Sequence, residues 1–220
     1  DLWVPVPPSS HQAMSGVHII AHPSAEYEIL MTDRYRSDRL RQHTAGTSTA
    51  YIHVSAGFGE STRDHVHAGA AAIWENGELI AENERFQTES AIIIADIDIE
   101  KLEGLRRRNS GFRCLSPDGT NASAYYRLYD RRSIGDAVLT DFGKKLYRHV
   151  EPHPFVPSGD LDYRCREILE IQIAGLIKRV SHINCQSAVI GISGGLDSTL
   201  ALIVAALAFD RLGWLRERIV

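Results

Sequence analysis

The sequence predicts an α/β protein built from two parts. Over the first 112 residues, short apolar stretches of strand type alternate with two stretches of helical character. The dipeptide Asn76-Gly77 stands between two such apolar stretches, which is the strongest short signal for a β-hairpin. Near the C-terminus, an apolar run is followed by two glycines and then by a helical pattern. A strand, a glycine loop and a helix in this order are typical of an anion-binding α/β unit.

The elements of the first part are expected in the following order along the chain. The sequence predicts strands at 16–21, 51–55, 71–74, 79–81 and 91–97, and helices at 34–48 and 99–108. The first helix is polar, and its side chains Arg34, Asp38 and Arg41 are expected in solvent. The second helix ends in three arginines, which suit the negative end of a helix dipole.

The second part begins after a stretch without periodicity. Residues 113–160 are rich in proline, glycine and charge, and they predict a connector on the surface, with a boundary near residue 155. From Asp162 to Val180, apolar residues recur at i, i+3 and i+4 spacing, which predicts a helix. Residues 187–192 predict a strand buried on both faces. A second helix, apolar almost all round, is expected over 199–212, with Ser198 or Thr199 as its cap.

Composition excludes several classes of function. The chain has 220 residues, 44% of them hydrophobic and 24% charged, and a net charge of −4, which gives no basic field for nucleic acid. No apolar run approaches the ~20 residues of a membrane helix. The three cysteines are widely spaced and form no Cys-x-x-Cys pair, which favours a reducing cytoplasm and argues against zinc. His65 and His67 lack a third ligand in the sequence, so surface histidines are favoured and no metal site is predicted.

The loop from Ser193 to Ser198 has the sequence Ser-Gly-Gly-Leu-Asp-Ser and is the candidate site for binding an anion. Its glycines permit backbone angles that turn amide groups around an anion, and the helix that follows adds free N–H groups. The loop lacks the Gly-Lys-Ser/Thr of a Walker motif and the Gly-x-Gly-x-x-Gly spacing of a dinucleotide site. It resembles the pyrophosphate loop of N-type ATP pyrophosphatases, which split ATP into AMP and pyrophosphate. A plain Gly-Gly turn is the structural alternative, disfavoured by six matched positions.

That resemblance implies an ATP site made of Ser193, Gly194, Gly195, Leu196, Asp197 and Ser198. The backbone amides of Gly194 to Leu196 and the two serine hydroxyls are the expected donors to the phosphates. Asp197 is expected to orient the loop through backbone N–H groups or to approach Mg²⁺, and a helix cap is an equally good interpretation. ATP and Mg²⁺ are the expected cofactors.

Taken together, the two parts resemble the glutamine-dependent NAD+ synthetases. The similarity lies in Asp1–Ser9, Ser55–Asp64, Trp74–Glu82, Arg85-Phe86, Glu170–Arg179 and Val189–Leu202. It implies that residues 1–112 form the C-terminal part of a nitrilase-like glutaminase domain, which is an α-β-β-α sandwich. Residues 113–160 would be the connector between this domain and the next. Residues 161–220 would then be the first strand, loop and helix of an N-type ATP pyrophosphatase (adenine nucleotide alpha hydrolase-like) domain.

The resemblance also implies a function. The chain would be a fragment of an ATP-dependent, AMP-forming amide ligase that converts deamido-NAD+ to NAD+ with ammonia from glutamine, homo-oligomeric as the full-length parent. The family's nucleophilic cysteine would fall two residues before Asp1, with its glutamate and lysine further upstream. No catalytic residue is therefore assigned, and the piece itself is expected to be inactive on glutamine. At Glu26 and Thr32, positions that resemble ones that help to hold glutamine, the family has serine and lysine or arginine instead.

Three alternatives stay open. A different ATP pyrophosphatase, similar to GMP synthetase or asparagine synthetase, would pair the loop with another type of glutaminase. A nitrilase-type amidohydrolase would leave the loop at 193–198 unexplained. A non-catalytic remnant would account for the departures at Glu26 and Thr32 and for the missing nucleophile.

Overall fold

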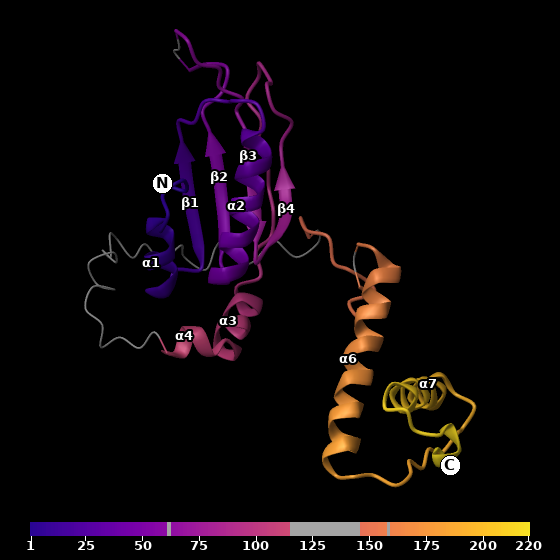
Figure 1. Cartoon of the computed structure of the whole chain (residues 1–220). Helices are drawn as coiled ribbons and strands as arrows, with labels where there is room; N and C mark the ends of the chain where they lie inside the picture. Colours follow the sequence, from indigo (N-terminus) through magenta and orange to yellow (C-terminus); the bar gives the residue numbers. More distant parts are fainter. Residues whose placement is uncertain (61–62, 115–145, 158) are drawn as a thin grey trace. The chain divides into compact units, whose positions relative to one another are not determined.

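The computed structural model describes residues 1–60, 63–114, 146–157 and 159–220. The chain divides into two compact units, Asp1–Val150 and Glu151–Val220. Because a mixed sheet is combined with helices, the α/β class is confirmed (Figure 1). In the part of the chain that the structure describes, no helix combines the length and the apolar character needed to cross a membrane.

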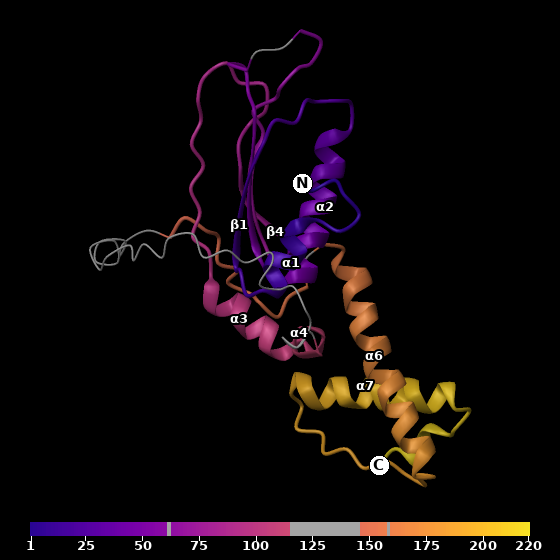
Figure 2. The same ribbon diagram turned by 90° about the vertical axis from the view of Figure 1, so that its left-hand side faces the viewer.

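The first unit is built on a four-stranded sheet in the order β1-β2-β3-β4. The strands are β1 (Ile19–Ser24), β2 (Ala50–Ser55), β3 (Ala71–Glu75) and β4 (Glu78–Glu82). The first two are parallel and are joined by helix α2 (Thr32–Thr47), whereas the other neighbours are antiparallel. Helix α2 lies on one face of the sheet with the short helix α1 (Pro8–Met14), as the edge-on view shows (Figure 2).

The core of this unit lies between the sheet and α2. Ile20 pairs with Tyr51 across β1 and β2, and Tyr51 pairs with Trp74 across β2 and β3, so the three side chains form a row on one face. Leu40 of α2 and Leu2 complete this buried cluster. Arg36, Leu40 and Thr44 of α2 are buried at four-residue spacing, which defines the face that α2 presents to the sheet.

The hairpin predicted around Asn76-Gly77 is confirmed. Both turn residues have positive φ, 47° for Asn76 and 87° for Gly77, as a two-residue turn of this twist requires. The helix predicted at 99–108 is confirmed as α3 (Ile99–Arg108), which Asp98 caps by accepting a hydrogen bond from the Lys101 N–H at 2.8 Å. A short helix, α4 (Ser110–Cys114), follows.

Three expectations for the first unit need correction. The strand at 91–97 is wrong: no strand pairs with it among the described residues, and Ile92 is 88% exposed. An apolar run without a neighbouring edge cannot satisfy a ladder of backbone hydrogen bonds. The first strand starts at Ile19 rather than residue 16, and of its side chains only Ile20 is fully buried. Helix α1 was not predicted, since its seven residues show no apolar period.

The second unit is a pair of helices. Helix α6 (Leu161–His182) confirms the helix predicted from Asp162. Asp160 caps it, since its side chain accepts a hydrogen bond from the Tyr163 N–H at 3.1 Å. It packs against α7 (Leu196–Arg211) through Ile173, Val204 and Ala208. A short 3-10 helix, η2 (Arg216–Arg218), precedes the C-terminus.

The buried strand predicted at 187–192 is also wrong for this chain. Residues 188–190 form three backbone hydrogen bonds with 218–220, which amount to one isolated parallel bridge between Ala188 and Ile219. Val189 is 82% exposed. A parallel strand is buried only when strands flank it and helices cover it, and the described residues supply one partial neighbour.

Candidate functional site

The loop at 193–198 joins the bridge segment to α7. Gly194 has a φ of 83°, so the loop uses a conformation that only glycine adopts without strain. Gly195 is extended instead, with φ −83° and ψ 167°, so the expectation that both glycines adopt special angles is correct for Gly194 alone. A Cβ on Gly194 would meet no atom within 4 Å, which leaves open space beside this part of the backbone.

The helix begins at Leu196, three residues earlier than predicted, and it has no side-chain cap. The expectation that Ser198 or Thr199 caps the helix is therefore wrong. Both hydroxyls instead lie inside the first turn and donate to the Gly195 carbonyl, at 3.1 Å from Ser198 and 2.9 Å from Thr199. The first N–H groups of an α-helix have no intrahelical partner, so those of Leu196, Asp197 and Ser198 are available to a ligand.

Ser193 and Ser198 converge at the mouth of this turn. Their hydroxyl oxygens lie 3.3 Å apart, and Ser198 Oγ also accepts from the Ser193 N–H at 3.3 Å. Asp197 is in the first turn of α7, where a carboxylate is favoured by the helix dipole, and the helix cap is Gly195, not Asp197. The structure thus brings the predicted residues together as hydroxyls and uncapped amides around one helix start, with one carboxylate beside them. Such a donor set suits a phosphate group and a Mg²⁺ ion bound to it.

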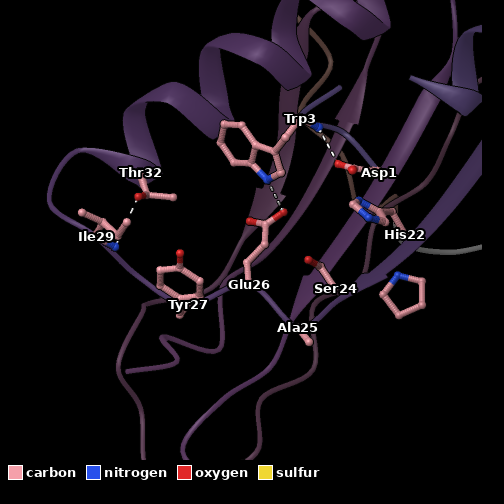
Figure 3. Close-up of a pocket in the computed structure, with 10 residues that line it drawn as sticks. Asp1, Trp3, His22, Ser24, Ala25, Glu26, Tyr27, Ile29 and Thr32 are labelled. Atoms are coloured by element: carbon pink, nitrogen blue, oxygen red, sulfur yellow. Dashed lines mark hydrogen bonds between the residues drawn. The ribbon is translucent and has the colours of Figure 1, made fainter. Parts of the chain in front are cut away.

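A second candidate site lies in the first unit, where a cavity of about 610 Å³ opens at the ends of β1 and α2 (Figure 3). Glu26 and Thr32, the two departures noted in the sequence, both line it. The other lining residues are Asp1, Trp3, His22, Pro23, Ser24, Ala25, Tyr27 and Ile29.

Glu26 is held at this cavity by two donors. Its Oε1 accepts from the Trp3 indole N–H at 2.8 Å, and its Oε2 accepts from Arg36 Nη1 at 3.3 Å. Thr32 accepts from the Ile29 N–H at 3.2 Å, which shapes the start of α2. Figure 3 shows the Trp3 and Thr32 contacts within the cavity lining.

Arg36 connects Glu26 to a chain of charges behind the cavity. It donates to Glu28 at 2.8 Å, and Glu28 in turn accepts from Arg85 at 3.2 Å. Arg85 also donates to Asp33 at 3.1 Å. Because Arg36 is only 4% exposed, its charge has to be compensated by these carboxylates.

Two histidines lie beside this network. His53 is fully buried, neither of its ring nitrogens has a hydrogen-bond partner among the described residues, and its Nε2 lies 3.9 Å from Glu26 Oε2. Burial lowers the pKa of His53 to about 4, so the imidazole is neutral at physiological pH. Burial also lowers the pKa of His22, which packs at 5.4 Å from the His53 ring. The sequence analysis missed both, because nothing in a single sequence shows that a histidine in a strand is buried.

His65 and His67 do not lie on a strand. His65 stacks on Tyr27 with ring centroids 4.2 Å apart, and His67 Nδ1 lies 2.8 Å from the Glu26 carbonyl oxygen. Among the residues with described positions, no group of three His, Cys, Asp or Glu side chains is arranged to hold a metal ion.

Comparison with known proteins gives the chain a clear set of relatives. It is 38% identical to the glutamine-dependent NAD(+) synthetase of Mycobacterium bovis and to that of Mycobacterium leprae, in each case along all of the chain and 32% of the relative. The protein of the same name from Thermotoga maritima is 26% identical over 96% of the chain and 33% of the relative. No protein-family model matches the chain.

The chain is similar throughout to part of a glutamine-dependent NAD(+) synthetase. The resemblance predicted from the two sequence parts is therefore confirmed, and the relatives are enzymes, as predicted. The chain spans about a third of the length of the curated relatives it matches.

Proposed function

We propose that the chain is part of an ATP-dependent, AMP-forming amide ligase that converts deamido-NAD+ to NAD+ with ammonia from glutamine. The identity of 38% along the whole chain is the observation that carries this proposal. The loop at 193–198 supports it independently, since its donors suit phosphate and its sequence carries no Walker motif.

The proposal extends to the two folds. Residues 1–112 would belong to a nitrilase-like sandwich, residues 113–160 to a connector, and residues 161–220 to the start of an N-type ATP pyrophosphatase domain. The sheet supports the first assignment, because α1 and α2 lie on one of its faces (Figure 2). Ile19 and Val54 alternate with the residues of the buried face, so they belong to the opposite face, and both are exposed. A homo-oligomeric parent and a cytoplasmic location are proposed with it, the latter on the free thiols of Cys165 and Cys185.

The proposed reaction solves a problem of leaving groups. The nicotinate carboxylate of deamido-NAD+ would have to expel oxide to become an amide. Attack of a carboxylate oxygen on the α-phosphorus of ATP breaks the bond to pyrophosphate and transfers the AMP group to that oxygen, and AMP is a far better leaving group than oxide. Ammonia then attacks the carbonyl carbon, the bond to AMP breaks, and NAD+ and AMP are formed.

In this reaction the loop would hold the phosphates that leave as pyrophosphate. The proposed donors are the backbone amides of Gly194 to Leu196 and the hydroxyls of Ser193 and Ser198, as expected from the sequence. The uncapped amides of Asp197 and Ser198 in the first turn of α7 are added to them. Asp197 lies next to these donors, where a carboxylate can bind Mg²⁺. The ion would offset the charge of the phosphates. Gly194 keeps the backbone open beside them.

The test is a chimaera in which this chain replaces the matching third of the Mycobacterium bovis synthetase. With deamido-NAD+, ATP, Mg²⁺ and ammonium chloride, it is expected to form NAD+ and AMP in equal amounts. Gly194→Ala should abolish both products, because alanine at a φ of 83° is strained and would shift the loop. Gly191→Ala is the matched control, since its Cβ meets no atom within 4 Å and its φ is not positive.

A folded chimaera that forms neither product would contradict the proposed function. Product formation that is unaffected by Gly194→Ala would contradict the role of the loop alone. Omitting glutamine from the assay keeps the result independent of the cavity in the first unit.

A further inference from the structure

A second cavity of the first unit, of about 330 Å³, lies between α2 and the hairpin of β3 and β4. It is lined by residues of α2, by His53 of β2, and by residues of β3, β4 and the segment that follows β4. It shares no lining residue with the cavity that contains Glu26. Its volume is at the lower end of the range of ligand pockets, about 300–1,000 Å³.

The buried end of this second cavity carries polar atoms without a partner. His53 is fully buried, and Trp74 is 7% exposed. Neither ring nitrogen of His53 nor the indole N–H of Trp74 has a hydrogen-bond partner among the described residues. Glu26 Oε2 lies 3.9 Å from His53 Nε2, which is too far for a hydrogen bond. Each unpaired buried polar group costs about 1–3 kcal/mol, so three such atoms at one cavity indicate a ligand that pairs with them.

These three nitrogens determine which groups the ligand has to offer. The indole N–H of Trp74 can only donate, whereas a neutral imidazole donates from one nitrogen and accepts at the other. Burial lowers the pKa of His53 to about 4, so its imidazole is neutral at physiological pH. The buried end therefore presents two donors and one acceptor. Hydroxyl groups match this set because each of them both donates and accepts, whereas an ammonium group has no acceptor for Trp74.

The open end of the second cavity carries acceptors. Three carboxylates line it, those of Asp33, Glu82 and Glu84, and the last two residues are exposed. Ionised carboxylates only accept hydrogen bonds, so they suit the hydroxyl groups of a ligand. They outnumber the two guanidinium groups of the lining, Arg36 and Arg85, which are already paired with carboxylates of their own network. An anionic ligand would therefore meet an excess of negative charge.

We propose that the second cavity binds a small uncharged polyol of the size of a five-carbon sugar alcohol. In this arrangement one hydroxyl oxygen accepts from the Trp74 indole N–H, and a neighbouring hydroxyl pairs with His53. The outer hydroxyls donate to the carboxylates at the open end. The inference goes beyond the proposed ligase and concerns the first unit alone, so it stands whether or not the loop at 193–198 supports that reaction.

The experiment titrates the full, isotope-labelled 220-residue chain with xylitol at neutral pH and follows the indole N–H signals by NMR. The chain has three tryptophans, so the Trp74 signal is assigned as the one that Trp74→Phe removes. Xylitol is expected to shift this signal saturably, at millimolar concentration, and to leave the signal of Trp214 in the second unit unchanged. A melting temperature would not report the site, because polyols stabilise folded proteins by exclusion from their surface.

Two analogues of xylitol test the chemistry of the ligand. Xylonate has the same carbon chain with a carboxylate at one end, and it should bind on the order of tenfold more weakly because of the carboxylates at the open end. The pentanediol with hydroxyls at its two ends alone lacks the inner hydroxyls, and it should also bind about tenfold more weakly.

Three variants test the place of binding. His53→Phe removes both ring nitrogens but keeps a buried ring, and it should weaken xylitol binding roughly tenfold. His18→Phe is the matched control, since His18 does not line the second cavity, and it should leave the affinity unaltered. Ser37→Leu narrows the second cavity from α2 and should abolish binding, which tests the site independently of the packing around His53.

A Trp74 signal that xylitol leaves unchanged would overturn the proposal and assign the second cavity to ordered water. Binding of xylonate or of the pentanediol as tight as that of xylitol would overturn it as well. So would a xylitol affinity that neither His53→Phe nor Ser37→Leu lowers. These readouts require no ATP and no turnover, so they are separate from the test of the ligase.

Discussion

Replacing Glu75 by alanine is expected to destabilise the first unit by about 3–5 kcal/mol, the usual cost of breaking a buried ion pair from one side. Glu75 ends β3 and is fully buried. Its carboxylate accepts from both terminal nitrogens of Arg148, at 3.0 Å and 3.1 Å, and from the Asp98 N–H at 2.8 Å. Through these bonds the Glu75 side chain connects the segments that contain Asp98 and Arg148 to the end of β3.

The magnitude follows from what the substitution leaves behind. Each hydrogen bond to a charged group contributes about 1.5–3 kcal/mol, and three such bonds are lost. Arg148 keeps a side chain that is only 15% exposed, without the carboxylate that compensates it. Relaxation of the arginine toward water recovers part of the loss, so the total falls below the sum of the bonds. Stabilities of small domains are about 5–15 kcal/mol, so the effect is a large fraction of the whole.

Urea unfolding followed by tryptophan fluorescence measures this loss, because Trp74 is the neighbour of Glu75 and is itself buried. Glu78→Ala is the matched control. Lys101 Nζ lies 3.5 Å from Glu75 Oε1 and 3.6 Å from Glu78 Oε2, across the turn, but the Glu78 side chain is 65% exposed. It should cost at most ~1 kcal/mol. The double variant Glu75→Ala/Arg148→Ala should be more stable than Glu75→Ala alone. Equal costs for Glu75→Ala and Glu78→Ala would refute the reasoning.

Three further predictions concern the same unit. Gly77→Ala should cost about 1–3 kcal/mol in urea unfolding, because its φ is 87° and the new Cβ would lie 3.0 Å from the Cβ of Ala45; wild-type stability would contradict this. Arg106→Ala should lower the free energy of unfolding, measured in urea, by about 2–3 kcal/mol, because the Arg106 guanidinium donates to three backbone carbonyl groups. Arg107→Ala is the control: its side chain is exposed, so its loss should change stability by less than ~0.5 kcal/mol, and equal costs for the two variants would contradict this. Acidification from pH 6.5 to 4 should lower the free energy of unfolding by roughly 3 kcal/mol through His53, because its pKa falls from the ordinary 6.5 to about 4 on folding and the unfolded chain takes up the proton first. His53→Gln should flatten that part of the pH profile, and an unchanged slope would show that other groups cause it.

Local chemistry explains which elements could be predicted. Three elements depend on residues within a few positions of each other: the Asn76-Gly77 turn and the helices that start after Asp98 and Asp160. The residues that stabilise each of them therefore lie together in the sequence, where they can be recognised. The runs at 91–97 and 187–192 have strand-like composition, but a strand exists only with a neighbour, and the sequence does not show the neighbour. Both runs remain outside any sheet for that reason.

The cavity of the first unit could not be predicted as a site for a related reason. Its charge network joins Glu26, Glu28 and Arg36 with Arg85, which is 57 residues from Glu28 in sequence. No spacing rule connects residues that far apart. In the sequence, this region is marked only by Glu26 and Thr32, which differ from the residues that the family has at these positions, and no local pattern indicates a site there.

The loop at 193–198 shows the reverse case, in which the residues were predicted and their hydrogen bonds were not. The serine and threonine after the glycines were expected to cap α7, yet their hydroxyls donate to the Gly195 carbonyl from inside the first turn. A helix start that lacks a side-chain cap forgoes about 0.5–2 kcal/mol. The chain contains the residue types for a cap and leaves the amides of Leu196 to Ser198 uncapped. An anion that accepts from those amides would recover the lost stability, so the same geometry that weakens the free helix favours a bound phosphate.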